Sequence, residues 1–308
     1  MQANQAENKL ALPQSVNVAD LSAQLSPAIG VQWLATTDST NQQLLAHGFN
    51  QSPYFLLGAD EQTQGRGRQA RPWLSESGSS LTFSIQMPLY ENGKSSASLP
   101  LAIGVAVAEA IERWLGLVND QSLSLKWPND ILKVDKTKGD NISSGQKIAG
   151  ILIEAKRSLV CGIGINVALP TSIIDTLSSS KKLSPSDALQ TVVPGALLHG
   201  HALEAGNTIE RRTQLVALVS NAVVAARRDH ERGGLALFSE RWNQRNAFAG
   251  QEVAAIDNGA VIAQGLCVGL GAGGELLIKT PKSGTVAIVA GDVSVRRQVG
   301  RHVRRLSG

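Results

Sequence analysis

Two strongly apolar segments, residues 148–155 and 159–167, lie only three residues apart and constrain the fold more than any other feature of the chain. Short apolar runs bounded by polar residues are typical of buried strands. Consecutive strands are usually neighbours in space. We therefore predict that these segments pair as central strands of a sheet.

Further strands and helices are predicted on both sides of this pair. The pattern predicts strands at 31–36, 54–59, 80–87 and 123–127, with 131–134 continuing the last of these. Helices are predicted at 99–115, 208–232 and 235–242. Ser39 or Thr40 is placed to cap another helix that begins there. This mixture of elements indicates a mixed α/β domain from residue 31 to residue 245.

The pattern changes after Asn246. Short strands are predicted at 251–256, 261–270, 275–279, 285–290 and 293–296, separated by glycine-containing turns. Strands at this spacing are typical of a small barrel. We expect an α+β protein with a flexible N-terminal extension at 1–30, a mixed-sheet domain at 31–245, a small β-domain at 246–297 and a basic tail at 298–308.

Charge and cysteine content exclude several classes of protein. The 29 Lys+Arg residues exceed the 25 Asp+Glu residues only slightly, so the net charge of +4 is weak support for a nucleic-acid partner. Cys161 and Cys267 lie far apart, which excludes a disulfide framework, and the histidines and cysteines lack zinc spacing. We expect neither a leader peptide, because residues 1–10 are polar, nor a membrane span, because the longest apolar stretch carries charges. We expect a soluble, cytoplasmic protein.

Residues 62–73 form the stretch with the strongest chemical implications. Arg66, Arg68 and Arg71 supply guanidinium groups that bind phosphate or carboxylate, and Trp73 supplies a flat face that can cover a ligand. This composition favours a loop that closes over an anionic ligand. A solvated surface loop is the alternative.

The glycines of this loop match a dinucleotide-binding fingerprint only formally. The spacing Gly65-x-Gly67-x-x-Ala70 is right, but polar residues separate it from the preceding strand and no helix follows. A Walker loop is excluded because no Gly-Lys-Ser/Thr sequence follows. A Rossmann site is therefore not expected.

Three further blocks carry candidate residues, each with a structural alternative. Residues 126–130, Lys-Trp-Pro-Asn-Asp, can orient a nucleotide or hold Mg²⁺ through Asp130, or form a plain turn. Lys147 stands at the start of an apolar strand, where it can meet an anion or serve as a surface gatekeeper. Gly162 and Gly164 interrupt a strand, as expected where a ligand approaches the backbone or where a bulge forms.

Together and in this order, these blocks resemble the biotin–protein ligase family. The resemblance rests on Ser39-Thr40-Asn41, the Gly-Arg-Gly-Arg loop with Trp73, Lys126 to Asp130, Lys147 to Glu154, and Gly162 to Asn166, and it covers most of the chain. It implies a mixed-sheet catalytic domain of the biotin/lipoate ligase type with a small C-terminal SH3-like β-barrel. It also implies that biotin and MgATP form biotinyl-5′-AMP, whose biotinyl group then passes to a lysine of a carrier domain.

The resemblance implies roles for individual residues. The expected biotin-binding residues are Ser39, Thr40, Gln62, Gly65, Arg66, Lys147, Gly150, Leu152, Gly162 and Gly164. The expected ATP- and adenylate-binding residues are Arg68, Arg71, Trp73, Lys126, Asn129, Asn166 and Arg296. Arg66 and Lys147 are the expected catalytic residues, because they would stabilise charge where the carboxylate attacks the α-phosphate. Asp130 is expected to contact Mg²⁺ or a lysine. No tightly bound prosthetic group is expected.

The resemblance also implies that the loop at residues 62–73 acts as a lid over the ligand. Gly65 and Gly67 would supply hinge freedom, and the closed loop would keep water from the adenylate. Residues 135–146 are longer than a tight turn requires, and neither they nor the basic tail has an assigned role.

The expected partner is the biotin carboxyl carrier domain of acetyl-CoA carboxylase or of a related carboxylase. The segment before residue 31 is too short and polar for the winged helix-turn-helix that many relatives carry, so we expect the monofunctional form, with neither DNA nor membrane as a partner; a homodimer is left open. The nearest alternative enzyme is a lipoate–protein ligase. The alternative from another class is a nucleic-acid-binding adaptor that uses the arginine loop, the basic tail and the barrel.

Overall fold

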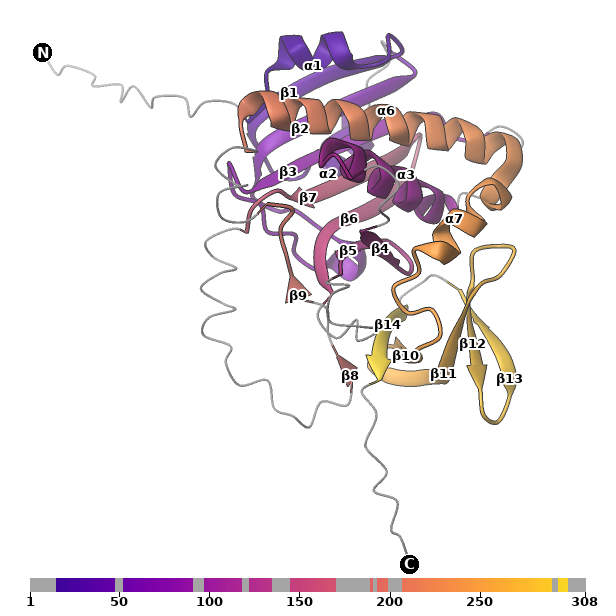
Figure 1. The fold of residues 1–308 in the computed structure, drawn as a ribbon. Helices are drawn as coiled ribbons and strands as arrows, with labels where there is room; N and C mark the ends of the chain where they lie inside the picture. The colour runs from indigo at the N-terminus through magenta and orange to yellow at the C-terminus, as the bar shows by residue number, and fades with distance from the viewer. Residues whose placement is uncertain are drawn as a thin grey trace, which may run out of the picture.

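The computed structural model describes residues 15–47, 52–90, 97–117, 122–134, 145–169, 189–190, 193–198, 207–289 and 293–298. They form a large mixed sheet with helices and a smaller C-terminal sheet beside it (Figure 1). The predicted insertion at 135–146 and the basic tail at 298–308 lie almost entirely outside the described residues.

The large sheet has the order β1-β2-β3-β7-β6-β5-β4, with β9 beside β6. The strands are β1 Ile29–Thr37, β2 Tyr54–Gln62, β3 Ser80–Met87, β4 Leu123–Lys126, β5 Asp130–Lys133, β6 Gln146–Ala155, β7 Leu159–Asn166 and β9 Val193–Pro194. β1 and β2 are parallel, as are β6 and β9, whereas the other neighbours are antiparallel. The predicted central pair is confirmed, because β6 and β7 pair along their length.

One strand prediction is wrong. The segment expected to continue 123–127 instead turns back, so that β5 pairs antiparallel with β4. Residues 127–129 make the turn, and Trp127–Pro128 is a cis peptide bond. The proline at this turn thus separates two strands that the apolar pattern alone had merged.

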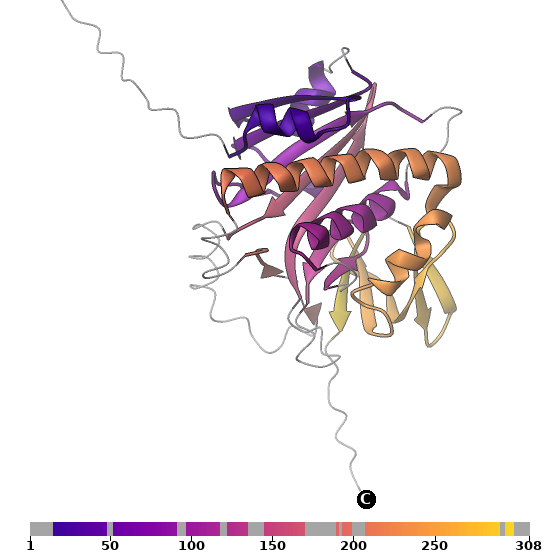
Figure 2. The same cartoon turned by 45° about the horizontal axis from the view of Figure 1, so that its top comes forward.

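Three helices cover one face of the large sheet (Figure 2). They are α1 Val18–Gln24, α3 Leu99–Trp114 and α6 Ile209–Gly233. α3 and α6 pack side by side, and their apolar residues join the inward residues of the strands in one continuous core. The N-cap of α6 is Thr208, whose side chain accepts from the N–H of Arg211.

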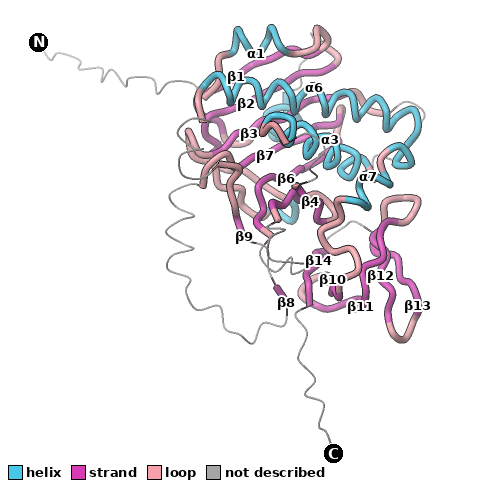
Figure 3. The backbone as a smooth tube through the Cα atoms, viewed as in Figure 1, coloured by secondary structure: helices cyan, strands magenta, loops and turns pink. Residues whose placement is uncertain are grey.

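The opposite face carries α2 Thr40–His47 and the loop after β2, which contains the 3₁₀ turn η1 Arg68–Ala70. A second, small apolar cluster joins Leu44 of α2 to Leu57 and Val160 of the sheet. Figure 3 distinguishes the helices and strands of the molecule from the loops that connect them. This face, which α3 and α6 leave uncovered, is where the site lies.

Part of the expected N-terminal extension is folded. Residues 15–30 hold α1 and the start of β1, and Val16 and Leu21 are buried in the main core. The Ser15 N–H donates to the buried Asp60 carboxylate at 2.8 Å. The prediction of a flexible segment up to residue 30 is therefore wrong for 15–30, because a few apolar residues are enough to dock a short helix; residues 1–14 lie outside the described residues.

The C-terminal sheet confirms the predicted small β-domain, and its neighbouring strands all pair antiparallel. It contains β10 Glu252–Asp257, β11 Ala260–Leu270, β12 Leu276–Thr280, β13 Gly284–Ile288 and β14 Val293–Gln298, in the order β13-β12-β11-β10-β14-β8. The last strand of this sheet, β8 Leu189–Gln190, precedes α6 in the chain and pairs with β14. The C-terminal sheet therefore includes a segment of the first domain. The helical segment predicted at 235–242 is η5 Gly234–Leu237 followed by α7 Ser239–Gln244.

The two sheets are joined by buried polar contacts. Arg245, just after α7, makes two 2.8 Å contacts with the Glu112 carboxylate of α3, and its carbonyl accepts from the Leu125 N–H of β4 at 2.7 Å. The Trp127 indole N–H donates to the Gly274 carbonyl in the turn before β12 at 3.0 Å. These contacts hold the C-terminal sheet against the 126–130 block. Within the described residues, no helix is long and apolar enough to cross a membrane.

Candidate functional site

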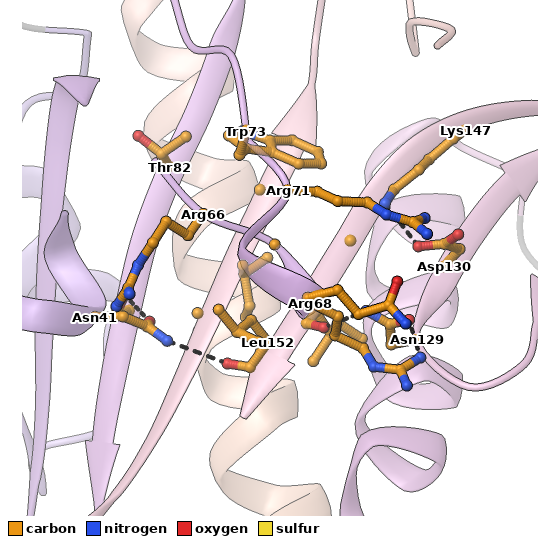
Figure 4. A pocket seen from close by; sticks show the side chains of 18 of the residues that line it. Asn41, Arg66, Arg68, Arg71, Trp73, Thr82, Asn129, Asp130, Lys147 and Leu152 are labelled. Carbon is orange, nitrogen blue, oxygen red and sulfur yellow. Dashed lines mark hydrogen bonds and ion pairs between the residues drawn. The ribbon is translucent and has the colours of Figure 1, made fainter. Parts of the chain in front are cut away.

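A cavity of about 220 Å³ opens on the sheet face that α3 and α6 do not cover. It is bounded by α2, the loop at 62–73, strands β3, β6 and β7, the 126–130 block and one residue of β14. Figure 4 shows side chains from these elements converging on it. Segments more than 200 residues apart in sequence therefore share one site.

Glycines of β7 form the floor of the cavity. Ile163 points into the main core, so Gly162 and Gly164 face the cavity. A Cβ on Gly164 would overlap the Trp73 indole, and one on Gly162 would overlap the Asn41 amide. Because these strand positions lack side chains, both groups lie directly on the backbone.

The loop after β2 folds back on itself as a narrow hairpin. Arg66 and Pro72 form an antiparallel bridge, and the Trp73 N–H donates to the Gly65 carbonyl at 2.8 Å. A Cβ on Gly65 would lie 2.5 Å from the Trp73 carbonyl oxygen. Gly65 therefore permits a close backbone approach that places the indole over the floor.

The strained positions of this hairpin are not its glycines. Gln69 and Ala70, at the tip, have φ of 56° and 52°, whereas Gly67 has φ of −102°. Left-handed backbone costs free energy at residues other than glycine. The tip strain was not visible from sequence, and the hinge role of the two glycines stays a prediction.

Neutral polar side chains line one end of the cavity. The Thr40 N–H donates to Gln62 Oε1 at 2.8 Å, and the Thr40 and Ser84 hydroxyl oxygens are 2.6 Å apart. Ser84 donates to Asn41 Oδ1 at 2.5 Å. Thr40, Asn41 and Ser84 are buried. This end offers directional hydrogen bonds without net charge, which suits an uncharged polar ring.

Cationic side chains gather at the other end. Asp130 Oδ1 lies 2.7 Å from Lys147 Nζ, and Asp130 Oδ2 lies 3.3 Å from Lys126 Nζ. Burial raises the pKa of the Asp130 carboxyl, but the two ammonium groups outweigh it and lower that pKa to about 2. Arg68 reaches Asn129 Oδ1 at 3.5 Å. With Arg71 also in the lining, this end is strongly positive and suits phosphate.

Asp130 does not fit a direct magnesium ligand. Each of its oxygens already faces an ammonium group, and neighbouring positive charge disfavours a bound cation. Among the described residues, no group of three or more His, Cys, Asp or Glu side chains is placed to hold a metal. Of the two predicted roles for Asp130, the structure favours the lysine partner.

Arg66 lies apart from the other cations. Its guanidinium is 3.9 Å from the Glu154 carboxylate, and the Gln42 amide oxygen, in the orientation that satisfies both groups, accepts from it at 2.7 Å. In Figure 4 it points toward Asn41, away from Lys147. Arg66 and Lys147, predicted to act together, therefore stand on opposite sides of the cavity.

The structure brings fifteen of the eighteen predicted site residues to the cavity lining. They are Ser39, Thr40, Gln62, Arg66, Arg68, Arg71, Trp73, Lys126, Asn129, Asp130, Lys147, Gly150, Leu152, Gly162 and Gly164. Their proximity makes them candidates for one site, and their individual roles stay predictions.

Three predicted residues are not in the lining. Gly65 acts through its backbone, because its carbonyl accepts a hydrogen bond from the Trp73 N–H. The Asn166 amide donates to the Gly195 carbonyl at 3.0 Å and so ties the 193–198 segment to the sheet. Arg296 is half-buried on β14, where its neighbour Val295 faces the cavity, because successive residues of a strand point to opposite sides.

Several lining residues were not predicted from sequence. Thr82 and Ser84 lie on β3, Asn41 on α2 and Val295 on β14. The alternation of polar residues at 80, 82 and 84 was a usable signal, because it marks one polar face on a strand whose other face is apolar. Nothing local marked Val295.

Comparisons with known proteins match both parts of the fold. A family model described as the biotin/lipoate A/B protein ligase family matches residues 33–167, and one described as the biotin protein ligase C-terminal domain matches residues 248–296. The chain is 28% identical over 272 residues to the bifunctional ligase/repressor BirA of Escherichia coli, which covers 86% of this chain and 74% of that protein.

Two further relatives align over nearly their whole length. The biotin–[acetyl-CoA-carboxylase] ligase of Paracoccus denitrificans is 28% identical, with 84% of this chain and 98% of that protein covered. The biotin protein ligase of Aquifex aeolicus, solved in complex with biotin and ATP, is 28% identical with a TM-score of 0.64, covering 87% of this chain and 99% of that one. With the fold, the cavity and both domain matches in agreement, the chain belongs to the biotin protein ligase family.

Proposed function

We propose that this protein is an ATP-dependent biotin–protein ligase. It forms biotinyl-5′-AMP from biotin and ATP, and transfers the biotinyl group to a lysine of a biotin carrier protein. The observation that carries the proposal is the two-ended cavity, neutral and polar at one end and cationic at the other, on this family's fold. Biotin has a matching shape, with an uncharged ureido ring at one end and a carboxylate at the other.

In this proposal, Ser39, Thr40 and Gln62 bind the ring, while Gly150, Leu152 and the glycines of β7 line the space for the apolar chain. Lys147 and Arg66 meet the carboxylate and the α-phosphate, from the two sides of the cavity. Arg68, Arg71, Lys126 and Asn129 bind the nucleotide phosphates. Asn166 and Arg296 act indirectly, by supporting the segment at 193–198 and the strand β14, which pairs with β10 and β8.

The first step joins two anions. A biotin carboxylate oxygen attacks the α-phosphorus, and pyrophosphate leaves with the electron pair of the broken P–O bond. Positive side chains fixed around the reacting atoms lower this barrier, because they stabilise the charge that develops and need no protein nucleophile. Magnesium enters as MgATP, bound mainly by phosphate oxygens and water.

Asp130 has a supporting role in this step. It holds Lys147 and Lys126 on the cavity wall, so that two like charges remain close together until phosphate arrives. The ligand then competes with Asp130 for the ammonium groups.

In the second step, the carrier lysine amine attacks the acyl carbon and AMP leaves. The adenylate must be kept from water until then. The Trp73 indole lies over the floor with its N–H buried and without a partner among the described residues, so it is placed to cover the ligand.

The carrier is a biotin carrier protein, and we propose that it is the biotin carboxyl carrier domain of acetyl-CoA carboxylase. The relatives named above are biotin ligases, which favours biotin over lipoate.

The decisive experiment incubates the protein with ATP, biotin and a carrier domain. A carrier mass increase of one biotinyl group, absent without ATP, is expected. A parallel reaction with lipoate should leave the carrier unchanged. Modification by lipoate alone would establish the lipoate ligase, and no modification with salt-sensitive polyanion binding would favour the nucleic-acid adaptor.

A further inference from the structure

A chain of hydrogen-bonded side chains runs from Glu154, which is not part of the cavity lining, to the neutral end of the cavity. Glu154 Oε2 accepts from Asn41 Nδ2 at 2.8 Å, and Asn41 Oδ1 accepts from Ser84 at 2.5 Å. The Ser84 and Thr40 hydroxyls are 2.6 Å apart, and Thr40 touches Gln62. Glu154 is the one charged member of this chain.

The charge at Glu154 determines which way every hydrogen bond in the chain points. A carboxylate only accepts, so the Asn41 amide must turn its NH₂ group toward Glu154, where the Leu152 carbonyl lies within 3.4 Å as a second acceptor. The amide oxygen must then face Ser84. The amide lies against the Gly162 backbone, and a Cβ there would overlap it. The contact with Gly162 fixes the position of the amide, and Glu154 decides which of its two ends faces Ser84.

The hydroxyl protons follow from this orientation. Ser84 has one proton, which goes to the Asn41 oxygen. The 2.6 Å contact between Ser84 and Thr40 needs a proton as well, and only Thr40 can supply it. Thr40 is also 3.1 Å from Gln62 Oε1, but its single proton is committed to the shorter contact. The Thr40 oxygen is thereby left with a lone pair for the cavity.

We propose that Glu154 is a positioning residue that, through Asn41 and Ser84, makes the neutral end of the cavity an acceptor of ligand N–H groups. The inference rests on the proposed function. On this inference, the preference of the cavity for the ureido N–H groups of biotin is set by a residue that is not part of the cavity lining. A ligand ring without N–H donors would leave the Thr40 oxygen unpaired.

Glu154 also lies near Arg66, so its effect on ring binding must be separated from an electrostatic effect exerted through Arg66. A double-mutant cycle makes this separation, because it measures whether two residues act through one another. Glu154→Gln preserves the shape of the side chain but replaces the carboxylate, which can only accept hydrogen bonds, with an amide. The amide can turn either its oxygen or its NH₂ group toward Asn41, so it no longer fixes the Asn41 orientation. Ser84→Ala cuts the chain and leaves the neighbourhood of Arg66 unchanged.

Biotin binding is measured by calorimetry for the wild type, both single variants and the double variant, with thermal melts to show that each is folded. Glu154→Gln is expected to raise the biotin Kd roughly tenfold, the loss of about one hydrogen bond. In the Ser84→Ala background, the same change should alter the Kd by less than about twofold. Glu109→Gln, which removes an exposed ion pair between Glu109 of α3 and Arg241 of α7, is the matched control and should leave the Kd unchanged.

The outcomes separate the two proposals. Equal effects of Glu154→Gln in both backgrounds would overturn the role of the chain, and so would a Kd unchanged by Glu154→Gln alone. If the wild type fails to bind biotin at all, the proposed function itself is wrong. Glu154→Asp, which keeps the charge, gives a second check: it should lose less affinity than Glu154→Gln.

Discussion

Replacing Glu112 with Gln should destabilise the protein severely. Glu112 on α3 accepts from Arg245 through both oxygens, each at 2.8 Å, and Glu112 Oε1 also accepts from the Leu123 N–H at 3.0 Å. The side chains of Arg245 and Glu112 are 6% and 3% exposed. The variant therefore leaves a guanidinium buried without a counter-charge, at the point where the C-terminal sheet joins α3 and β4.

The magnitude follows from the burial. Breaking a buried ion pair by removing one partner costs about 3–5 kcal/mol. Two buried, charge-assisted hydrogen bonds at roughly 1.5–3 kcal/mol each lead to a similar figure. At about 2–4 °C per kcal/mol, the melting temperature should fall by roughly 10 °C.

Urea unfolding followed by circular dichroism, with thermal melts beside it, measures this loss. The matched control is Glu109→Gln on the same helix, where Arg241 and Glu109 are 45% and 36% exposed and the loss should stay below about 1 kcal/mol. Replacing both buried partners together, Glu112→Leu with Arg245→Met, should recover most of the lost stability. If Glu112→Gln costs no more than Glu109→Gln, the reasoning from burial is refuted.

Two further predictions follow from the cavity. The folded pKa of Asp130, about 2, lies below its ordinary value of 3.8, so its stabilisation is present above about pH 4 and is lost as the pH falls from about 4 to about 2. Asp130→Asn should cost on the order of 2 kcal/mol at pH 7 and flatten the stability profile across that window, and a profile as steep as that of the wild type would contradict this account. Gly164→Ala should displace the Trp73 indole from the floor and speed release of bound adenylate roughly tenfold in a filter assay. Gly104→Ala, where a Cβ would make ordinary contacts with Leu125 at 3.6 Å and Ile151 at 4.0 Å, should release it at the wild-type rate. Equal rates for the two variants would show that the indole does not cover the ligand.

Much of the fold could be predicted because its signals are local. The apolar runs that became β6 and β7, the helical spacing of α3 and α6, and the short strands after residue 250 all appear in the structure near the predicted positions. The errors occurred where a few residues override a weak pattern. A proline turn separates β4 from β5, and Val16 and Leu21 dock a segment whose composition is mainly polar.

The site could be assembled from sequence only as a set of blocks. Each block contains residues of a suitable type, and their combination indicated the family. The blocks face one cavity because β3, β6 and β7 pair with one another and because Trp127 ties the 126–130 block to Gly274 of the C-terminal sheet.

What the sequence alone determined is the inventory of the site: arginines and a tryptophan on one loop, lysines beside an aspartate, and glycines on a central strand. Tertiary structure alone decided which of these groups contact one another and which lie apart. It separates Arg66 from Lys147, pairs Lys147 with Asp130, and brings Asn41 to Glu154 from 113 residues away. The physical reason is that hydrogen-bond direction and charge pairing depend on distances between atoms, and only the folded sheet sets those distances.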